Sequence, residues 1–461
     1  MADMEPPPPP PLAPGKTVPH ISRERMVLLF SVMLVTAAGN TAMQSVMPSI
    51  GTELGVADFW ISLAYTWSAL LWVICAPIWA RRSDRRGRKS MMAVGLVGFI
   101  ASMGLCGIVL WFGLIGLIPA VWTLILFALA RSLYGGFGSA APPAVQAYVA
   151  SRTPRSERTQ ALALIASSFG LGTVIGPALA PMLIFPKSGL VGPFIAFALI
   201  AAAVLVALRL RLPNDAPSYA ARGRVVTAPF SAGANSSLSG DDDSDDTPAG
   251  AVSEQRAEEE DIPRLRWNDP RVRPWLVAGL LGGHAQAATL GIIGFFILDR
   301  MGLRADPMAG TGPIGMVLMA GAISTLLAQW GLIPMLKLGP RASIMWGMAL
   351  AALGTVTFAV SHDLHSISLG FAIASLGFGL FRPGFTAGAS LAVSRREQGQ
   401  VGGTVASVNG AAYILAPAVG VWLYGHHPAI GFSVICGLCA MVYVLGWRWL
   451  TPDDVLTRDL A

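Results

Sequence analysis

Few side chains that could do chemistry lie near the middle of the long apolar stretches of this chain. Arg131, His284 and Arg382 are the groups there that are charged or can be charged near neutral pH. An arginine can hold an anion, and a histidine is the side chain that most readily carries a proton near neutral pH. The 26 Asp and Glu all fall outside the middle of these stretches. We therefore expect a buried site of positive potential that takes a neutral or anionic ligand.

The elements that position these groups are long and hydrophobic. The chain is 54% hydrophobic and only 13% charged, against about 25% charged in soluble domains. Stretches of about 20 apolar residues are long enough to cross a bilayer. They fall at 26–50, 58–80, 89–111, 119–149, 158–184, 191–210, 272–298, 310–336, 341–361, 364–393, 400–424 and 429–450. This pattern predicts an all-α integral membrane protein with twelve transmembrane helices in two pseudo-symmetric six-helix bundles.

The segments outside the spans differ sharply in composition. Ten of the 26 acidic residues lie between Asp241 and Asp261, in a stretch rich in Ser, Pro and Gly that is typical of a flexible tether. We predict a disordered cytoplasmic tail at 1–25 and an N-terminal six-helix bundle at 26–210. A cytoplasmic linker at 211–271 joins it to a C-terminal bundle at 272–450, and a second cytoplasmic tail follows at 451–461.

The basic residues predict the orientation in the membrane. If the N-terminus is cytoplasmic, only Lys187, Arg300 and Arg304 of the 32 Lys and Arg fall in loops on the outer side. Cytoplasmic loops of membrane proteins are enriched in Lys and Arg. Both termini are therefore expected in the cytoplasm, with the chain in the inner membrane. The same bias accounts for the net charge of +6 without a nucleic-acid partner.

The two halves of the chain repeat one another. Residues 76–95 align without gaps on residues 328–347, which matches Gly87 with Gly339 and Lys89 with Arg341. A second set of identities relates 157–178 to 397–418. Repeats of the same orientation are related by an axis along the membrane normal, and the substrate site of such proteins lies between them near mid-membrane.

A charged motif follows the second predicted span. Ser83 to Lys89 read S-D-R-R-G-R-K, in which Asp84, Arg85, Gly87, Arg88 and Lys89 resemble motif A, G-x-L-A-D-R-x-G-R-K, of the major facilitator superfamily. The resemblance implies a cytoplasmic gate that these charges lock. Ala80 stands where the motif begins with Gly, which leaves the charges of the lock in place.

Two further motifs extend this resemblance to the twelve-helix drug:proton antiporters of the same family. Arg131 and Gly135 match motif B, R-x-x-x-G, whose arginine is linked to proton transfer in the family. Gly172, Gly176 and Pro177 match the antiporter motif C, G-x-x-x-G-P, although Ala180-Pro181 replace its closing Gly pair. Two Gly one turn apart also allow close helix packing, which is the plain structural interpretation.

Polar side chains within spans are costly, so each is a candidate for the substrate cavity as well as for hydrogen bonding between helices. The candidates are Asn40, Gln44, Gln146, His284, Gln286, Arg382, Asn409 and Tyr413. Relatives that expel cationic drugs place Asp or Glu in the first, seventh or tenth span, which this chain does not. We therefore expect a neutral or anionic substrate, such as a carboxylate metabolite, a siderophore-like chelator or an uncharged antibiotic, and His284 as the proton carrier.

These observations together predict a monomeric, proton-coupled exporter of a small organic molecule, without enzymatic activity, cofactor or metal. Three alternatives stay open at this point. One is an importer or uniporter of a small metabolite. A second is a copper carrier, suggested by the spacing of Cys436 and Cys439 together with 18 Met. The third is a ligand sensor that does not transport. The acidic linker is the only feature that favours it.

Overall fold

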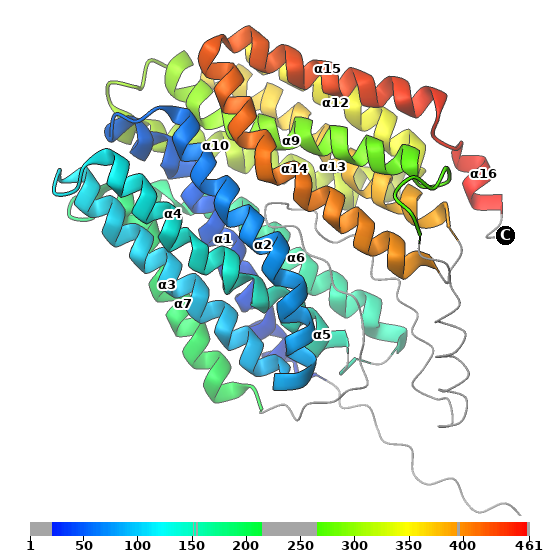
Figure 1. Cartoon of the computed structure of the whole chain (residues 1–461), viewed down its shortest axis with the longest axis horizontal. Coiled ribbons are helices and arrows are strands. Elements are labelled where there is room, and N and C mark those ends of the chain that lie inside the picture. The colour runs from blue at the N-terminus through cyan, green and yellow to red at the C-terminus, as the bar shows by residue number, and fades with distance from the viewer. Residues whose placement is uncertain (1–20, 151, 154, 214–264, 394–396, 459–461) are drawn as a thin grey trace, which may run out of the picture.

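A computed structural model describes residues 21–150, 152–153, 155–213, 265–393 and 397–458 (Figure 1). Most of the predicted N-terminal tail (residues 1–20) and most of the predicted linker (residues 214–264), with its acidic run at 241–261, lie outside these residues. The described part is helical and contains no strand. Helices satisfy their backbone hydrogen bonds internally, which is what a chain of this hydrophobicity needs in a bilayer.

Each of the twelve predicted spans corresponds to one helix or to one broken helix. The spans of the N-terminal half (the N-half) are α1 (Arg23–Glu53), α2 (Asp58–Arg86), α3 (Arg88–Leu114), α4 with α5 (Ala120–Gly136 and Ala141–Ala150), α6 (Arg155–Leu179) and α7 (Gly192–Arg211). The spans of the C-terminal half (the C-half) are α9 (Arg273–Arg300), α10 with α11 (Pro307–Leu326 and Ile333–Leu336), α12 (Pro340–Val360), α13 (Leu364–Leu391), α14 (Gln398–His426) and α15 (Pro428–Arg448). Eleven spans are long and apolar enough to cross a membrane, and α6 contributes a shorter apolar stretch, Leu164–Leu179. The predicted fold class is confirmed.

Two spans are broken where a single helix was predicted. In the fourth span a 3₁₀ turn, Gly138–Ala140, separates α4 from α5. Pro142 and Pro143 follow this turn, and proline has no N–H to donate to the preceding turn. In the eighth span a π-helical turn, Leu327–Leu332, separates α10 from α11. Such π turns are frequent at functional sites.

The predicted C-terminal tail is partly structured. Helix α16 (Asp453–Arg458) begins inside the segment that was predicted as a tail. The carboxylate of Asp453 accepts the backbone N–H groups of Arg341 and Ala342, at 2.8 and 3.0 Å, and so satisfies donors at the start of α12. This contact ties α16 to the C-half.

The two bundles lie side by side, the N-half in blue to green and the C-half in green to red (Figure 1). We call the end that carries Arg211, Arg273 and the C-terminus the linker end, and the opposite end, where α1 ends and α10 begins, the far end. In the view of Figure 1 the bundles meet at the far end and their axes separate towards the linker end. Across the interface α2 packs on α14 and α6 packs on α10, while α1 touches α9 and α10.

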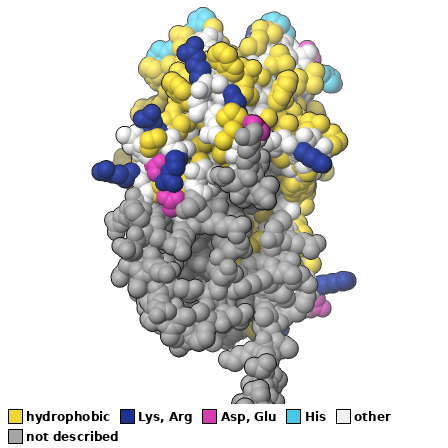
Figure 2. All heavy atoms as spheres, turned by 90° about the vertical axis from the view of Figure 1, so that its right-hand side faces the viewer, with side chains coloured by type: hydrophobic (Ala, Val, Ile, Leu, Met, Phe, Trp, Pro, Cys, Tyr) yellow, Lys and Arg dark blue, Asp and Glu magenta, His cyan; other side chains and the backbone are white. Residues whose placement is uncertain are grey.

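The outer surface of the bundles is suited to lipid. Large apolar side chains such as Leu199, Val206 and Leu210 are exposed on α7. Exposed tryptophans gather near helix ends, as is common at membrane interfaces. They include Trp60, Trp111, Trp122 and Trp422 towards the far end and Trp267, Trp447 and Trp449 towards the linker end. Figure 2 looks onto the linker end and shows Lys and Arg side chains among hydrophobic ones.

Candidate functional site

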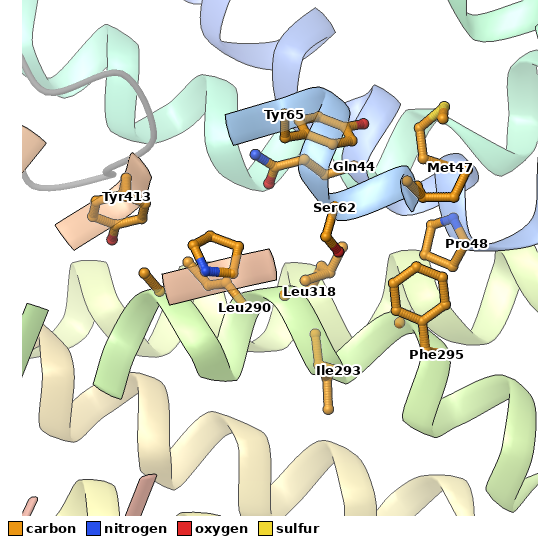
Figure 3. Close-up of a pocket in the computed structure, with 15 residues that line it drawn as sticks. Gln44, Met47, Pro48, Ser62, Tyr65, Leu290, Ile293, Phe295, Leu318 and Tyr413 are labelled. Atoms are coloured by element: carbon orange, nitrogen blue, oxygen red, sulfur yellow. The ribbon is translucent and has the colours of Figure 1, made fainter. Parts of the chain in front are cut away.

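The first of two neighbouring pockets between the halves, here called the apolar chamber, contains about 700 Å³ of empty space, part of which is open to solvent. Its walls come from α1 and α2 on one side and from α9, α10 and α14 on the other (Figure 3). The labelled wall residues are Gln44, Met47, Pro48, Ser62 and Tyr65 of the N-half, with Leu290, Ile293, Phe295, Leu318 and Tyr413 of the C-half. None of the lining residues is charged. This chamber suits an apolar or aromatic body.

The second pocket, the polar chamber, contains about 730 Å³ of empty space, part of which is open to solvent. It shares three wall residues with the apolar chamber, Gln44, Leu290 and Leu318. Polar side chains reach it from both halves. They are Thr41, Gln44, Thr173, Gln286, Thr289, Thr325, Gln329, Ser375 and Arg382. Among the described residues that line the two chambers there is no Asp or Glu, and Arg382 is the single charged one. These linings thus carry one positive charge and no negative charge.

Half of the eight predicted cavity residues line a chamber, namely Gln44, Gln286, Arg382 and Tyr413. The other four line neither chamber: Asn40, Gln146, His284 and Asn409. Asn40 and Gln146 are buried within the N-half. His284 is half-buried on α9, where its Nδ1 bonds to the carbonyl oxygen of Leu280 at 2.7 Å. The proton-carrier role of His284 stays a prediction.

Motif B places Arg131 in the core of the N-half and not in a chamber. Arg131 is fully buried on α4, and its Nη2 donates to Oδ1 of Asn40 on α1 at 3.1 Å. The guanidinium carbon also lies 5.2 and 4.9 Å from the ring centres of Tyr65 and Tyr134. Cation–π contacts of this kind stabilise a desolvated arginine. Gly135, one turn on, lets α4 pack against the backbone of α2 at Ser68.

Motif C packs α6 against α1 and brings it to the interface between the halves. A Cβ on Gly172 would lie 2.7 Å from the Leu34 carbonyl oxygen, and one on Gly176 would collide with the Ala38 carbonyl oxygen. Thr41 Oγ1 donates to the carbonyl oxygen of Gly172 at 3.3 Å. The two Gly therefore allow the close helix packing that their spacing indicated. Pro177 lines the polar chamber.

The described part of motif A caps helices within the N-half. Gly87 has φ of 88°, which glycine adopts without strain, and so turns the chain from α2 into α3. Lys89 Nζ donates to the carbonyl oxygen of Arg209 at 3.0 Å and to that of Leu212, at the end of α7. The side chains of Asp84 and Arg85 lie outside the described residues. The gate role of motif A stays a prediction.

The residue that the internal repeat matches to Lys89 makes the equivalent contact. Arg341, at the start of α12, donates from Nε to the Gly446 carbonyl oxygen at 2.9 Å and from Nη2 to that of Trp447 at 2.8 Å. These carbonyls end α15, the sixth span of the C-half, as Arg209 and Leu212 end the sixth span of the N-half. A cation at a helix C-terminus also offsets the helix dipole. In each half, a basic residue at the start of the third span thus binds the last carbonyl groups of the sixth span.

A charged cluster joins the halves at the far end, and sequence reasoning did not assemble it. Arg304, between α9 and α10, donates to Asp58 at the start of α2 at 2.6 and 2.8 Å. It also donates to Asp299 of α9 at 2.7 Å and to Thr52 of α1 at 3.1 Å. The hydroxyl of Tyr424 donates to Asp299 at 2.7 Å. The hydrogen bonds to Asp58, and then those to Asp299, raise the pKa of Arg304, which keeps it charged.

Ion pairing differs between the two ends. At the linker end, Arg271 pairs with Asp269 and Glu397, each at 2.8 Å, and all three belong to the C-half. Hydrogen bonds from Arg271 lower the pKa of Asp269, so this pair persists in mild acid. Among the ion pairs of the described ranges, Arg304 with Asp58 is the one that crosses between the halves. At the far end the two halves are thus joined by the ion pair between Arg304 and Asp58.

Comparison with known families agrees with this architecture. A sequence profile of the Major Facilitator Superfamily matches residues 29–336 and 330–459, which is nearly the whole chain. The chain belongs to the Major Facilitator Superfamily. The resemblance stated from the three motifs is confirmed at the level of the family.

Segments of the chain are similar to curated members of the superfamily. One is 26% identical over 160 residues to the multidrug resistance protein MdtG of Proteus mirabilis (strain HI4320), covering 34% of this chain and 37% of that protein. Another is 31% identical over 134 residues to a multi-drug resistance efflux pump PmrA homolog of Lactococcus lactis subsp. lactis (strain IL1403), covering 29% and 30%. A third is 30% identical over 195 residues to multidrug resistance protein 1 of Bacillus subtilis (strain 168), covering 42% and 46%. The matches thus span less than half of these relatives' own length.

Solved structures of the superfamily share the fold over its full extent. The human organic anion transporter MFSD10 (TETRAN) aligns with a TM-score of 0.58 and 19% identity, covering 92% of this chain and 100% of that one. A POT family transporter in complex with 5-aminolevulinic acid aligns with a TM-score of 0.65 and 14% identity, covering 96% and 99%. At this identity the likeness shows the fold, and the chambers between its two bundles are where members of such folds bind substrate.

Proposed function

We propose that this protein is a proton-driven secondary exporter that moves neutral or anionic small organic compounds by alternating access. The observation that carries the proposal is the pair of chambers between the halves, which together offer an apolar body and polar groups, one arginine and no carboxylate. The similarity of segments to multidrug resistance proteins supports export. A cationic drug would find no counter-ion among the lining residues, and a buried unpaired charge is costly.

The conformation fits one state of the alternating cycle. Charge joins the halves at the far end, and the bundles separate towards the linker end (Figure 1). With the linker and both termini in the cytoplasm of the inner membrane, as the Lys and Arg bias predicts, the structure is an inward-facing state. In the opposite state the motif A charges, including Asp84 and Arg85, would hold the cytoplasmic side closed.

Proton coupling is assigned to Arg131 and His284. Arg131 contacts Asn40 and two tyrosine rings in the N-half core. Because it links α4 to α1, a change in these contacts would alter the packing of both helices. His284 is the one histidine near the middle of a predicted span. His284→Asn should weaken the dependence of transport on the proton gradient, because asparagine cannot carry a proton. A dependence identical to that of the wild type would remove His284 from the mechanism.

Reconstituted vesicles test the function. The full chain in proteoliposomes, with a proton gradient imposed across the membrane, would be offered fluorescent compounds that share one aromatic body and differ only in charge. We expect the neutral and anionic compounds to move against their gradients, and the movement to stop when a protonophore removes the proton gradient. Transport of the cationic compound alone would contradict the proposal, and so would transport that survives the protonophore.

A further inference from the structure

Arg382 occupies in the C-half the place that Arg131 occupies in the N-half. The sequence L-F-A-L-A-R, residues 126–131, aligns with G-F-G-L-F-R, residues 377–382, and both arginines lie in the fourth span of their half. Both are deeply buried, with Arg131 fully enclosed and Arg382 only 3% exposed. The internal repeat therefore supplies a built-in comparison of one arginine in two settings.

The two arginines differ in how their hydrogen-bond donors are used. Arg131 has Asn40 as an acceptor and two tyrosine rings beside it. Arg382 has the ring of Tyr413 at 5.9 Å from its guanidinium carbon. Its Nε, Nη1 and Nη2 are all buried, and the one acceptor beside them in the described part of the chain is the hydroxyl of Tyr413, with which none of them makes a well-formed hydrogen bond. A guanidinium carries five N–H donors and no acceptor, so most of the donors of Arg382 are left without an acceptor.

These unused donors open onto the polar chamber. Arg382 lines the chamber together with Gln329 of the π-helical turn, whose amide nitrogen is also buried without an acceptor in the described part of the chain. The other polar groups of the chamber wall are hydroxyls and amides, and none is a carboxylate. The wall thus presents the buried, positively charged donors of Arg382 to the polar chamber.

We propose that Arg382 and Gln329 form a subsite for a carboxylate group of the substrate, whose apolar body extends past Gln44 into the apolar chamber. The inference rests on the proposed function and narrows its substrate class to organic monocarboxylates. The planar fork of a guanidinium matches the two oxygens of a carboxylate, and hydrogen bonds between charged groups are the strong ones. A single arginine without lysine partners fits one negative charge better than a doubly charged phosphate.

Three pyrene compounds would test the subsite on the purified full chain in detergent: 1-pyrenebutyrate, the uncharged 1-pyrenebutanol and a pyrenebutyl trimethylammonium. Binding is read from quenching of tryptophan fluorescence. We expect the wild type to bind the butyrate at least tenfold more tightly than the butanol, and the trimethylammonium most weakly. In Arg382→Leu the advantage of the butyrate over the butanol should disappear, while the affinity for the butanol changes less than twofold.

Two further variants separate this subsite from a general effect of positive charge. Arg382→Lys keeps the charge but loses the planar fork, and should retain only part of the tenfold preference. Gln329→Leu should reduce the preference about threefold. The matched control is Gln146→Leu, a buried glutamine of α5 that lines neither chamber, which should leave the preference unchanged. A melting curve of each variant shows that it is folded.

The outcomes distinguish this inference from the broader proposal. The inference is overturned if the wild type binds the butyrate no better than the butanol, or if Arg382→Leu keeps the full preference. Proton-driven transport of the butanol in proteoliposomes would leave the proposed function standing in either case. Preferential binding of the butyrate without transport of any of the three compounds would instead support the subsite and contradict the exporter.

Discussion

Arg304 holds the carboxylate of Asp58 with both of its terminal guanidinium nitrogens, at 2.8 and 2.6 Å, and so bridges the two halves at the far end. The same guanidinium contacts Asp299, and Thr52 accepts a further bond from it. A two-pronged contact to a carboxylate is geometrically specific. The two halves cannot separate at this end without breaking it, so the cluster is expected to set how often the far end opens.

Loss of Arg304 should open the far end. A cysteine placed at Ser62, on the N-half wall of the apolar chamber, would report the opening in a background without the four native Cys. In right-side-out vesicles, Arg304→Ala should raise the rate of labelling by an impermeant maleimide severalfold. The reason is that the mutation removes the ion pair between the halves, which lowers the free energy of opening by about 1–3 kcal/mol.

Arg300 provides the matched control for this experiment. Its Nη2 donates to the Ala359 carbonyl oxygen at 2.8 Å, a contact inside the C-half. Arg300→Ala therefore removes a nearby positive charge without touching the bridge between the halves. Equal labelling rates in Arg304→Ala and Arg300→Ala would show that the cluster is not what keeps the far end closed.

Lys89 and Arg341 should act as independent caps. Each holds the final carbonyls of the sixth span of its own half, so Lys89→Ala and Arg341→Ala are each expected to cost about 0.5–2 kcal/mol of stability. Because the two sites share no partner, the losses should add in the double variant. The measurement is unfolding in detergent mixtures, with Arg209→Ala, an exposed side chain of α7, as control. A double variant that loses much more than the sum would mean that the two sites are coupled through the gate.

Much of this fold follows from local sequence properties. Hydrophobicity and length predict a membrane span without knowledge of its neighbours, and for this reason all twelve spans could be predicted. The spacing of Gly172 and Gly176 indicated close packing, because two glycines one turn apart let any neighbouring helix approach the backbone closely. The absence of carboxylates from the chambers followed from counting, since no Asp or Glu lies in the middle of a span.

The features that were not predicted depend on which helices meet. Asp58, Asp299, Arg304 and Tyr424 come from distant parts of the chain, and each alone is an ordinary residue at a helix end. His284 was predicted to line the substrate cavity because its depth in α9 is suitable, but depth does not fix the direction in which a side chain points. Helix α16 is too short and polar to be predicted, and its contact through Asp453 with the start of α12 is a tertiary one.

Gly176 should tolerate no side chain. A Cβ there would collide with the Ala38 carbonyl oxygen and with Thr41, so Gly176→Ala should push α6 away from α1 at a cost of about 1–3 kcal/mol. The control is Gly437→Ala on α15, where a Cβ meets nothing within 4 Å. Helical glycine is less stable than alanine by about 0.5–1 kcal/mol, so this control should melt at the same temperature or higher. The packing argument fails if both variants melt alike.

Asn40 should matter chiefly through Arg131. Its amide oxygen is the acceptor for the Nη2 of Arg131, and the Nε and Nη1 of that arginine are buried without an acceptor among the described residues. Asn40→Ala would leave the whole guanidinium with aromatic faces alone, at an expected cost of about 1–3 kcal/mol. Ser45→Ala, also buried on α1, removes a hydroxyl that bonds only within its own helix, so it should cost less than about 1 kcal/mol.

A double-mutant cycle isolates this interaction. Once Arg131→Met has removed the buried charge, Asn40→Ala no longer leaves donors without an acceptor, so its cost should shrink to that of a small cavity. The measurement is again the unfolding free energy of the four proteins in detergent mixtures. If Asn40→Ala costs as much in the Arg131→Met background as in the wild type, the buried arginine does not depend on Asn40, and the stability of the N-half core must come from the faces of Tyr65 and Tyr134 instead.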